Sequence, residues 1–320
     1  MIDTPRANLP VGTPTPAASW RQRHLLDVDQ LDRDEIIRCL DLAAELRSLR
    51  KRRERLDSLA GHVIGLAFAE PSTRTRVSFE IAATSLGAQV VELPMQASSA
   101  TKGESLIDTL LTLERTGIDT VVMRHPASGA PYLAARATTL RVVNAGDGTH
   151  AHPTQALVDA LTLRDALGTL QDAVVAIVGD IGHSRVARSD MLLLTALGAT
   201  VRLTGPSSWT RGFEHWPGVE VHPRLEEALE DADAVMALRV QLEREAGGGV
   251  PSLHEYTARW GLDAERMRLA RPGAPLLHPG PTNEGVELTA ALASGPRSLI
   301  GQQVANGVAV RMAVLTLLAA

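Results

Sequence analysis

Short apolar runs alternate with segments of helical pattern along this chain, and the alternation restricts the folds open to it. The apolar runs cover residues 63–68, 89–93, 120–124, 141–145, 173–178, 200–204, 233–238 and 274–278. The helical patterns cover residues 32–49, 105–116, 186–197 and 304–318, and another helix starts near residue 77. Asp32 and Glu35 are expected as capping partners at the start of the first helix. Strands that alternate with helices build parallel sheets, whose strands are buried and therefore apolar. The sequence thus predicts an α/β fold, with a second α/β unit that begins near residue 173.

Composition narrows the class of protein. The 320 residues suffice for two domains, and a formal net charge of −5 argues against general nucleic-acid binding. The one cysteine, Cys39, lies in an apolar helical pattern and is expected in the core, without a partner for a disulfide or a zinc site. No apolar run approaches the roughly 20 residues of a membrane span, and we expect a cytoplasmic protein. Residues 1–20 are expected to form a disordered tail.

A polar turn at residues 71–76 (PSTRTR) joins the first apolar run to the helix that follows. At such a strand–helix turn, free backbone N–H groups and the positive end of the helix dipole face one point. Hydroxyl groups donate to oxyanions, and arginine matches phosphate oxygens with two parallel N–H groups. The turn lacks the glycines of a P-loop or a dinucleotide fingerprint. We interpret it as a binding site for a small molecule that carries a phosphate.

Other strand ends carry cationic or neutral donor side chains. These are Arg124 and His125, His150 and His152, Arg185, Arg239, and His278. Ligands of parallel sheets bind beyond the carboxyl ends of the strands, so these groups favour a set of anionic ligands. Acidic residues are scarce there, which argues against chemistry with paired carboxylates and against a magnesium-dependent kinase.

A possible metal site and an isolated lysine are two further features of the sequence. Asp147, His150 and His152 are close enough in sequence to share a metal, but a further ligand is not evident, and no metal or other cofactor is expected. The chain has 32 basic residues, of which only Lys51 and Lys102 are lysine. An isolated lysine in a chain that uses arginine elsewhere indicates a need for a compact ammonium group, which favours a functional Lys102.

The phosphate turn, read with its flanks as residues 68–76 (FAEPSTRTR), resembles the carbamoyl phosphate signature of the transcarbamoylase family. Further segments resemble the aspartate carbamoyltransferase branch of that family in the same order. They are residues 122–126 (VMRHP), 146–155 (GDGTHAHPTQ), 239–241 (RVQ), 277–281 (LHPGP) and 303–311 (QVANGVAVR). The resemblance runs from about residue 22 to the C-terminus, and six motifs in order are highly specific.

The resemblance implies a fold and a reaction. The fold has two domains, each a parallel β-sheet flanked by helices, joined by interdomain helices. Residues 21–153 plus 305–320 would bind carbamoyl phosphate, and residues 154–304 would bind aspartate. The reaction transfers a carbamoyl group to the α-amine of L-aspartate in pyrimidine biosynthesis.

The resemblance also implies roles for single residues. Carbamoyl phosphate would be bound by Ser72, Thr73, Arg74, Thr75, Ser98, Lys102, Arg124, His152, Gln155, Pro279 and Gly280. Among these, Arg74, Thr75, Arg124, His152 and Lys102 would be catalytic. Aspartate would be bound by Lys102, Arg185, Arg239 and Gln241. Glu70 and Arg244 would pair across the domains on closure.

In this family Ser98 and Lys102 reach the site of a neighbouring chain, which implies a homotrimer with shared active sites. A regulatory chain or a dihydroorotase are candidate further partners. The main alternative is an ornithine or other amino-acid carbamoyltransferase, although the segment at His278 lacks the cysteine typical of the ornithine enzymes. A catalytically silent scaffold chain of a pyrimidine-pathway complex is the other alternative. Glu284 stands where many relatives have arginine, and its effect is left open.

Overall fold

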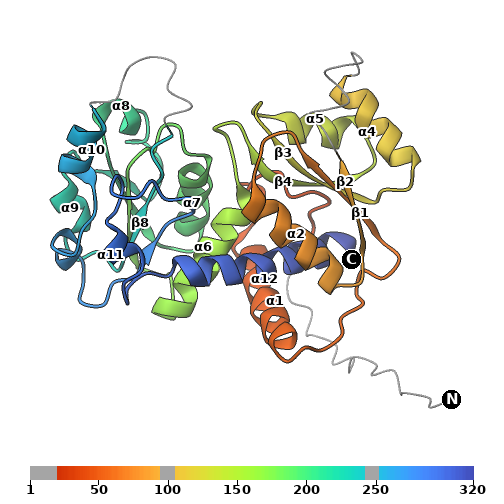
Figure 1. Ribbon diagram of the computed structural model, residues 1–320, viewed down its shortest axis with the longest axis horizontal. Helices are drawn as coiled ribbons and strands as arrows, with labels where there is room; N and C mark the ends of the chain where they lie inside the picture. The colour runs from red at the N-terminus through yellow and green to blue at the C-terminus, as the bar shows by residue number, and fades with distance from the viewer. Residues whose placement is uncertain (1–19, 94–104, 242–251) are drawn as a thin grey trace.

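The computed structural model describes residues 20–93, 105–241 and 252–320, which form two lobes side by side (Figure 1). Each lobe is built on one parallel sheet, and the two sheets have four and five strands. The chain completes the first sheet before it begins the second, as the order of the apolar runs predicts. None of the helices in the described residues combines the length and apolarity that crossing a membrane requires.

The first sheet has the strand order β2-β1-β3-β4. Its strands are β1 (Val63–Phe68), β2 (Gln89–Leu93), β3 (Thr120–His125) and β4 (Arg141–Asp147). Its helices are α1 (Arg33–Lys51), α2 (Thr73–Ser85), α4 (Leu106–Arg115) and α5 (Ala130–Ala137). Buried residues of α4 and α5 cover one face of this sheet, and those of α1 and α2 lie on the other. Strands β1, β3 and β4 are therefore mostly buried, which explains their apolar residues, whereas the edge strand β2 is more exposed.

The second sheet has the strand order β7-β6-β5-β8-β9. Its strands are β5 (Val174–Val178), β6 (Thr200–Thr204), β7 (Val219–Val221), β8 (Ala234–Ala237) and β9 (Leu276–Leu277). Its helices are α7 (Arg185–Ala196), α8 (Ser207–Thr210), α9 (Leu225–Leu229), α10 (Leu253–Trp260), η2 (Arg266–Arg268) and α11 (Ala290–Ala293). Helices α9, α10 and η2 bury an aromatic-rich cluster against the outer face, and α7 lies on the opposite face.

Two helices join the lobes: α6 (Pro153–Leu167) and α12 (Ile300–Ala319). Helix α6 packs against α7 of the second lobe and against α1 of the first, and α12 packs along α1, α2 and α6. The largest hydrophobic cluster runs through both helices and reaches Ile64 of β1 and Ile177 of β5. One continuous core thus connects the two sheets, and their strand ends lie near the same boundary between the lobes.

The predicted fold class is confirmed: two parallel sheets flanked by helices and joined by interdomain helices. The eight predicted apolar runs all lie on observed strands, and their ends differ from those of the strands by at most two residues. At the start of α1, Asp32 and Glu35 form a reciprocal capping box. Cys39 is fully buried in the core, which raises the pKa of its thiol to about 12. The short elements α5, α8, α9, α11 and β7 had no clear signal in the sequence.

Candidate active site

The phosphate turn lies where β1 ends and α2 begins. Ser72 is the N-cap residue of α2 and has extended backbone angles, yet within the described residues its hydroxyl makes no capping hydrogen bond. The first turn, from Thr73 to Arg76, contains no carboxylate. The N–H groups of this turn and the positive end of the helix dipole are therefore available to an anion. Arg74 is exposed beside them, and Thr75 is buried at the same turn.

Glu70 joins one arginine of each lobe just before this turn. Its Oε1 lies 2.5 Å from Nη2 of Arg124 at the end of β3 and 2.6 Å from Nη2 of Arg185 at the start of α7. Burial alone would raise the pKa of Glu70, but the hydrogen bonds and charges of Arg185 and Arg124 outweigh it and lower that pKa. The carboxylate is therefore ionised at neutral pH and holds both guanidinium groups at the boundary between the lobes.

Two glycines allow arginine side chains to cross this boundary. Gly146 has a φ of +114°, and a Cβ atom there would lie 2.9 Å from Cζ of Arg185. Gly280 has a φ of +65°, and a Cβ atom there would collide with the guanidinium group of Arg74. Arg74 Nη1 donates to the carbonyl oxygen of Pro279 at 3.5 Å. The loop after β9 thus lies directly against the phosphate turn.

Two buried histidines lie among these arginines. His152 is 4% exposed, and burial together with the charges of Arg185, Arg124 and Arg311 lowers its pKa well below the ordinary value. His278 is 1% exposed, and burial together with Arg74 and Arg239 lowers its pKa to about 3. Both imidazoles are neutral at pH 7 and keep one N–H each. Within the described residues, His152 Nδ1 and His278 Nε2 are buried without a hydrogen-bond partner.

The segment after β8 carries Arg239 and Gln241, the other two residues that are expected to bind aspartate. The charge of Arg239 acts on His278, which places it near the loop after β9. The backbone N–H of Gln241 donates to Asp180 Oδ2 at 3.1 Å, and its side-chain amide donates to the His183 carbonyl at 3.3 Å. Gln155 lies on the first turn of α6, next to His152.

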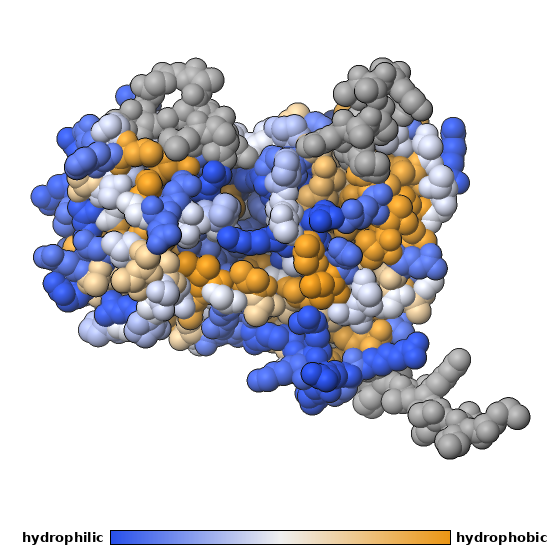
Figure 2. Space-filling model, viewed as in Figure 1, coloured by the Kyte–Doolittle hydropathy of each residue, from blue (hydrophilic) through white to orange (hydrophobic). Residues whose placement is uncertain are grey.

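The structure therefore brings most of the expected site residues to one boundary between the lobes. Figure 2 shows the molecule hollowed between the lobes, with hydrophilic residues on the visible walls. Three expected residues, Ser98, Lys102 and Arg244, lie outside the described residues. Glu284 is exposed in the loop before α11.

Two acidic residues that support the site were missed in the sequence. Asp180, at the end of β5, accepts from Gln241 and pairs with His183 Nδ1 at 2.7 Å. Glu287 accepts from the backbone N–H of Val240 at 2.8 Å. Asp180 follows the buried strand β5 by two residues, which is the one sequence signal that pointed to it. The two carboxylates accept from the backbone N–H groups of Val240 and Gln241 and so hold the backbone of the 239–241 segment.

Asp147 organises the turn before α6. Its carboxylate accepts from the backbone N–H groups of Gly129 at 2.7 Å and Ala151 at 3.1 Å, and His150 Nδ1 lies 3.1 Å from it. Among the described residues, His, Cys, Asp and Glu side chains do not gather in a group of three that could hold a metal ion.

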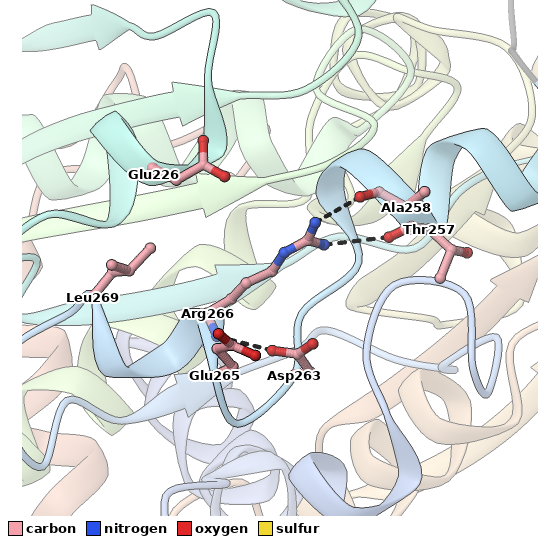
Figure 3. A pocket seen from close by; sticks show the side chains of 7 residues that line it. All are labelled: Glu226, Thr257, Ala258, Asp263, Glu265, Arg266 and Leu269. Atoms are coloured by element: carbon pink, nitrogen blue, oxygen red, sulfur yellow. Dashed lines mark hydrogen bonds between the residues drawn. The ribbon is translucent and has the colours of Figure 1, made fainter.

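A separate pocket of about 560 Å³ lies on the outer face of the second lobe (Figure 3). Its lining includes the carboxylates Glu226, Asp263 and Glu265. The guanidinium group of Arg266 donates to the backbone carbonyls of Thr257 at 3.3 Å and Ala258 at 2.6 Å. The pocket therefore presents negative charge and does not suit the anions that the phosphate turn favours.

Comparison with known families gives two matches in tandem. Residues 23–165 match the model of the aspartate/ornithine carbamoyltransferase carbamoyl-P binding domain. Residues 171–318 match the model of the aspartate/ornithine carbamoyltransferase Asp/Orn binding domain. The two matches divide the chain between the two sheets described above.

Individual relatives are similar over almost the whole chain. The aspartate carbamoyltransferase catalytic subunit of Gluconacetobacter diazotrophicus is 50% identical over 99% of this chain and 98% of its own length. That of Thermus thermophilus is 53% identical over 92% of this chain and 96% of its own.

Solved structures are similar in fold. Aspartate transcarbamoylase from Trypanosoma cruzi in complex with carbamoyl phosphate has a TM-score of 0.85 at 31% identity, covering 94% of this chain and 98% of its own. Ornithine carbamoyltransferase from Pyrococcus furiosus has a TM-score of 0.83 at 27% identity, covering 93% and 97%. The similarity in fold therefore does not distinguish aspartate carbamoyltransferases from ornithine carbamoyltransferases. The sequence identity of about 50% over nearly the full chain is to aspartate carbamoyltransferases.

Proposed function

The chain belongs to the aspartate/ornithine carbamoyltransferase family, and we propose that it transfers the carbamoyl group of carbamoyl phosphate to the α-amine of L-aspartate. The products are N-carbamoyl-L-aspartate and phosphate, as in pyrimidine biosynthesis. The observation that carries this proposal is the start of α2, which lacks a side-chain cap within the described residues and lies at the same boundary as the arginines and neutral histidines. Relatives at about 50% identity that bear the aspartate carbamoyltransferase name support the choice of aspartate.

The phosphate turn would hold the phosphate group. Ser72, Thr73, Arg74 and Thr75 supply backbone N–H groups, hydroxyls and a guanidinium at one helix start. Arg124, at the end of the neighbouring strand β3, would bridge the phosphate and the carbamoyl oxygen. Gln155 and the backbone at Pro279 and Gly280 would contact the carbamoyl NH2 group, because these groups present hydrogen-bond acceptors.

Catalysis would depend on positioning and on stabilisation of negative charge. The uncharged amine of aspartate attacks the carbamoyl carbon and forms a new C–N bond, and the carbonyl becomes an oxyanion. Thr75, Arg124 and the N–H of neutral His152 would donate to that oxygen, and a donor of this kind contributes about 3–4 kcal/mol. The bond from carbon to the phosphate oxygen then breaks, and the departing phosphate takes the proton from the amine. Such a path needs no protein carboxylate as a base.

Arg185, Arg239 and Gln241 would bind the two carboxylates of aspartate. Arg185 already pairs with Glu70 across the lobes, so we propose that Glu70, together with Arg244, holds the lobes closed around bound substrates. Two arginines suit a dicarboxylate better than the cationic side chain of ornithine. A domain division at residues 21–153 plus 305–320 and 154–304 fits the packing of α12 along α1 and α2.

The proposed assembly is a cytoplasmic homotrimer in which Ser98 and Lys102 complete the site of a neighbouring chain. A regulatory chain and a dihydroorotase are the candidate partners of that trimer. Mixing Lys102→Gln subunits with Arg74→Ala subunits tests the shared sites, because one site of a mixed trimer would then lack neither residue. Activity that reappears on mixing supports the arrangement, and mixed trimers that stay inactive contradict it.

The reaction itself is tested with the purified chain. Carbamoyl phosphate is supplied with L-aspartate or with L-ornithine, and carbamoyl aspartate, citrulline and phosphate are measured. We expect carbamoyl aspartate and phosphate in equal amounts. Citrulline as the main product would establish the ornithine reaction instead, and an intact oligomer that forms neither product would indicate a silent scaffold chain.

A further inference from the structure

A buried carboxylate on α6, Asp159, connects two parts of the site that are far apart in sequence. Its side chain is 0% exposed, in a layer formed by α6, α7 and α12. One oxygen, Oδ1, accepts from the side-chain amide of Gln155 at 2.9 Å and from that of Gln303 at 2.7 Å. Neither glutamine can reverse its amide without turning an oxygen toward this carboxylate oxygen, which would be repulsive.

The first bond fixes what Gln155 offers to a ligand. Its NH2 group is turned toward Asp159, one helical turn further along α6. The amide oxygen Oε1 is then the atom left for the site, and it can only accept a hydrogen bond. Gln155 is half-buried on the first turn of α6, whose N-cap residue is His152.

The second bond reaches the loop after β9. Gln303 Oε1 accepts from the backbone N–H of His278 at 3.0 Å, and His278 Nδ1 accepts from the backbone N–H of Gly280 at 2.8 Å. Because the Gly280 N–H is directed to His278, the carbonyl of the same peptide group, that of Pro279, points the opposite way. That carbonyl faces Arg74 of the phosphate turn.

We propose that Asp159 is a positioning residue that turns two acceptors, Gln155 Oε1 and the Pro279 carbonyl, toward the carbamoyl NH2 group. The site would thereby prefer carbamoyl phosphate to an acyl phosphate of equal shape and charge that has no N–H, such as acetyl phosphate. This inference rests on the proposed function. The inference extends the proposed function, because it assigns the recognition of the NH2 group to a residue that does not touch the substrate.

Charge in the buried layer supports this role. Burial and the charge of Asp159 raise the pKa of Asp190, on α7, well above its ordinary value, so Asp190 is neutral. Burial raises the pKa of Asp159 itself to about 7, against the lowering effect of its two amide bonds and of Arg311. With a proton on Oδ2, Oδ1 is still an acceptor, so both amides stay oriented in either protonation state. An asparagine with its oxygen in the same place would do the same.

The test compares Asp159→Leu and Asp159→Asn with Asp190→Leu and Asp190→Asn in the full-length chain. Asp190 is the matched control because it is equally buried and, within the described residues, both its carboxylate oxygens have no hydrogen-bond partner. Dissociation constants for carbamoyl phosphate and for acetyl phosphate are measured by titration calorimetry without aspartate. Their ratio is the readout, since a general loss of structure weakens both ligands alike.

We expect Asp159→Leu to reduce the preference for carbamoyl phosphate by roughly tenfold to a hundredfold, the range for a ligand N–H that loses its acceptors. Asp159→Asn should restore the ratio to within about threefold of the wild type, and the Asp190 variants should keep it. If Asp159→Leu does not fold, Asp159→Ala gives the same readout without added volume.

A wild-type ratio in Asp159→Leu, or an equal loss in Asp190→Leu, overturns the proposal. So does a wild-type protein that binds acetyl phosphate as tightly as carbamoyl phosphate while it still forms carbamoyl aspartate. A wild-type protein that forms no carbamoyl aspartate at all contradicts the proposed function instead, so the two failures are distinct.

Discussion

Two helices begin at comparable places in the two sheets but have different N-termini. Helix α2 follows the interior strand β1, and α7 follows the interior strand β5. Both have a serine as N-cap residue. The Ser184 hydroxyl accepts from the backbone N–H of Ala187 at 3.1 Å and so caps α7, whereas within the described residues Ser72 makes no such bond at α2.

In the proposed site, this difference would give two ways of binding an anion with the same local fold. The start of α2 would offer its backbone N–H groups to the ligand, which suits a compact phosphate. The start of α7 uses the Ala187 N–H group for its own cap and would present the buried guanidinium of Arg185 instead. A side chain reaches farther than a backbone N–H and pairs with a planar carboxylate, which suits the acceptor amino acid.

Ser72→Asp should have the largest effect. An aspartate is a good N-cap residue and places a carboxylate where the phosphate would bind, so we expect at least about a thousandfold loss of kcat/KM with an unchanged or higher Tm. Activity assays and thermal unfolding measure the two effects. Thr289→Asp at the N-cap of α11, where the side chain already caps the helix, is the control and should keep full activity. An active Ser72→Asp enzyme would show that the phosphate binds elsewhere.

Arg74→Gln and Arg185→Gln should separate the two substrates. A charge-assisted hydrogen bond contributes about 1.5–3 kcal/mol, so each change should weaken the binding of one substrate by roughly tenfold to a hundredfold. We expect Arg74→Gln to act mainly on carbamoyl phosphate and Arg185→Gln mainly on aspartate, measured as separate KM values. Arg188→Gln is the control on α7, because Arg188 donates to the Gly182 carbonyl and lies over the Phe213 ring. Equal effects of both variants on both substrates would contradict the comparison.

His278→Asn should change how stability depends on pH. The pKa of His278 is lowered to about 3 in the folded protein, while the unfolded chain binds the proton near pH 6.5. Stability therefore falls as the pH drops below 6.5, by about 1.4 kcal/mol per pH unit, or about 2 kcal/mol by pH 5. Asparagine can still accept from Gly280 and does not titrate, so the variant should lose this part of the slope. Urea unfolding from pH 7 to pH 5 measures it; parallel curves for both proteins would contradict the assignment.

The strands, the first helix cap and the family could be predicted because their signals are local or lie in contiguous motifs. Apolar runs mark β1 and β5, and Asp32 with Glu35 marks the start of α1. The family and the carbamoyl transfer reaction are confirmed by relatives that match nearly the full chain. The strand orders and the short helices of the second lobe were not predicted, because long-range packing decides them.

The arginine and histidine side chains at the boundary between the lobes were likewise visible in the sequence, as an excess of these residues at strand ends. The carboxylates that hold them in place were not. Three such carboxylates are buried, namely Asp159, Asp180 and Glu287. Their roles depend on partners that are distant in sequence, such as Gln303 for Asp159. One local signal existed, since Gln155 and Asp159 are four residues apart on one helix. The roles of single site residues, the domain boundaries and the trimer stay predictions.

The smallest expected effect compares the two N-cap serines directly, as Ser72→Ala and Ser184→Ala. Loss of a capping hydroxyl costs about 1 kcal/mol, so Ser184→Ala should lower the free energy of unfolding by that amount and leave kcat/KM nearly unchanged. Ser72→Ala should show the reverse, with unchanged stability and weaker binding of carbamoyl phosphate, since in the described part of the chain the Ser72 hydroxyl makes no capping bond that could be lost. Urea unfolding and initial rates on the same two proteins give both readouts. If both variants lose stability equally, Ser72 caps its helix in solution, and the start of α2 is not kept free for a ligand.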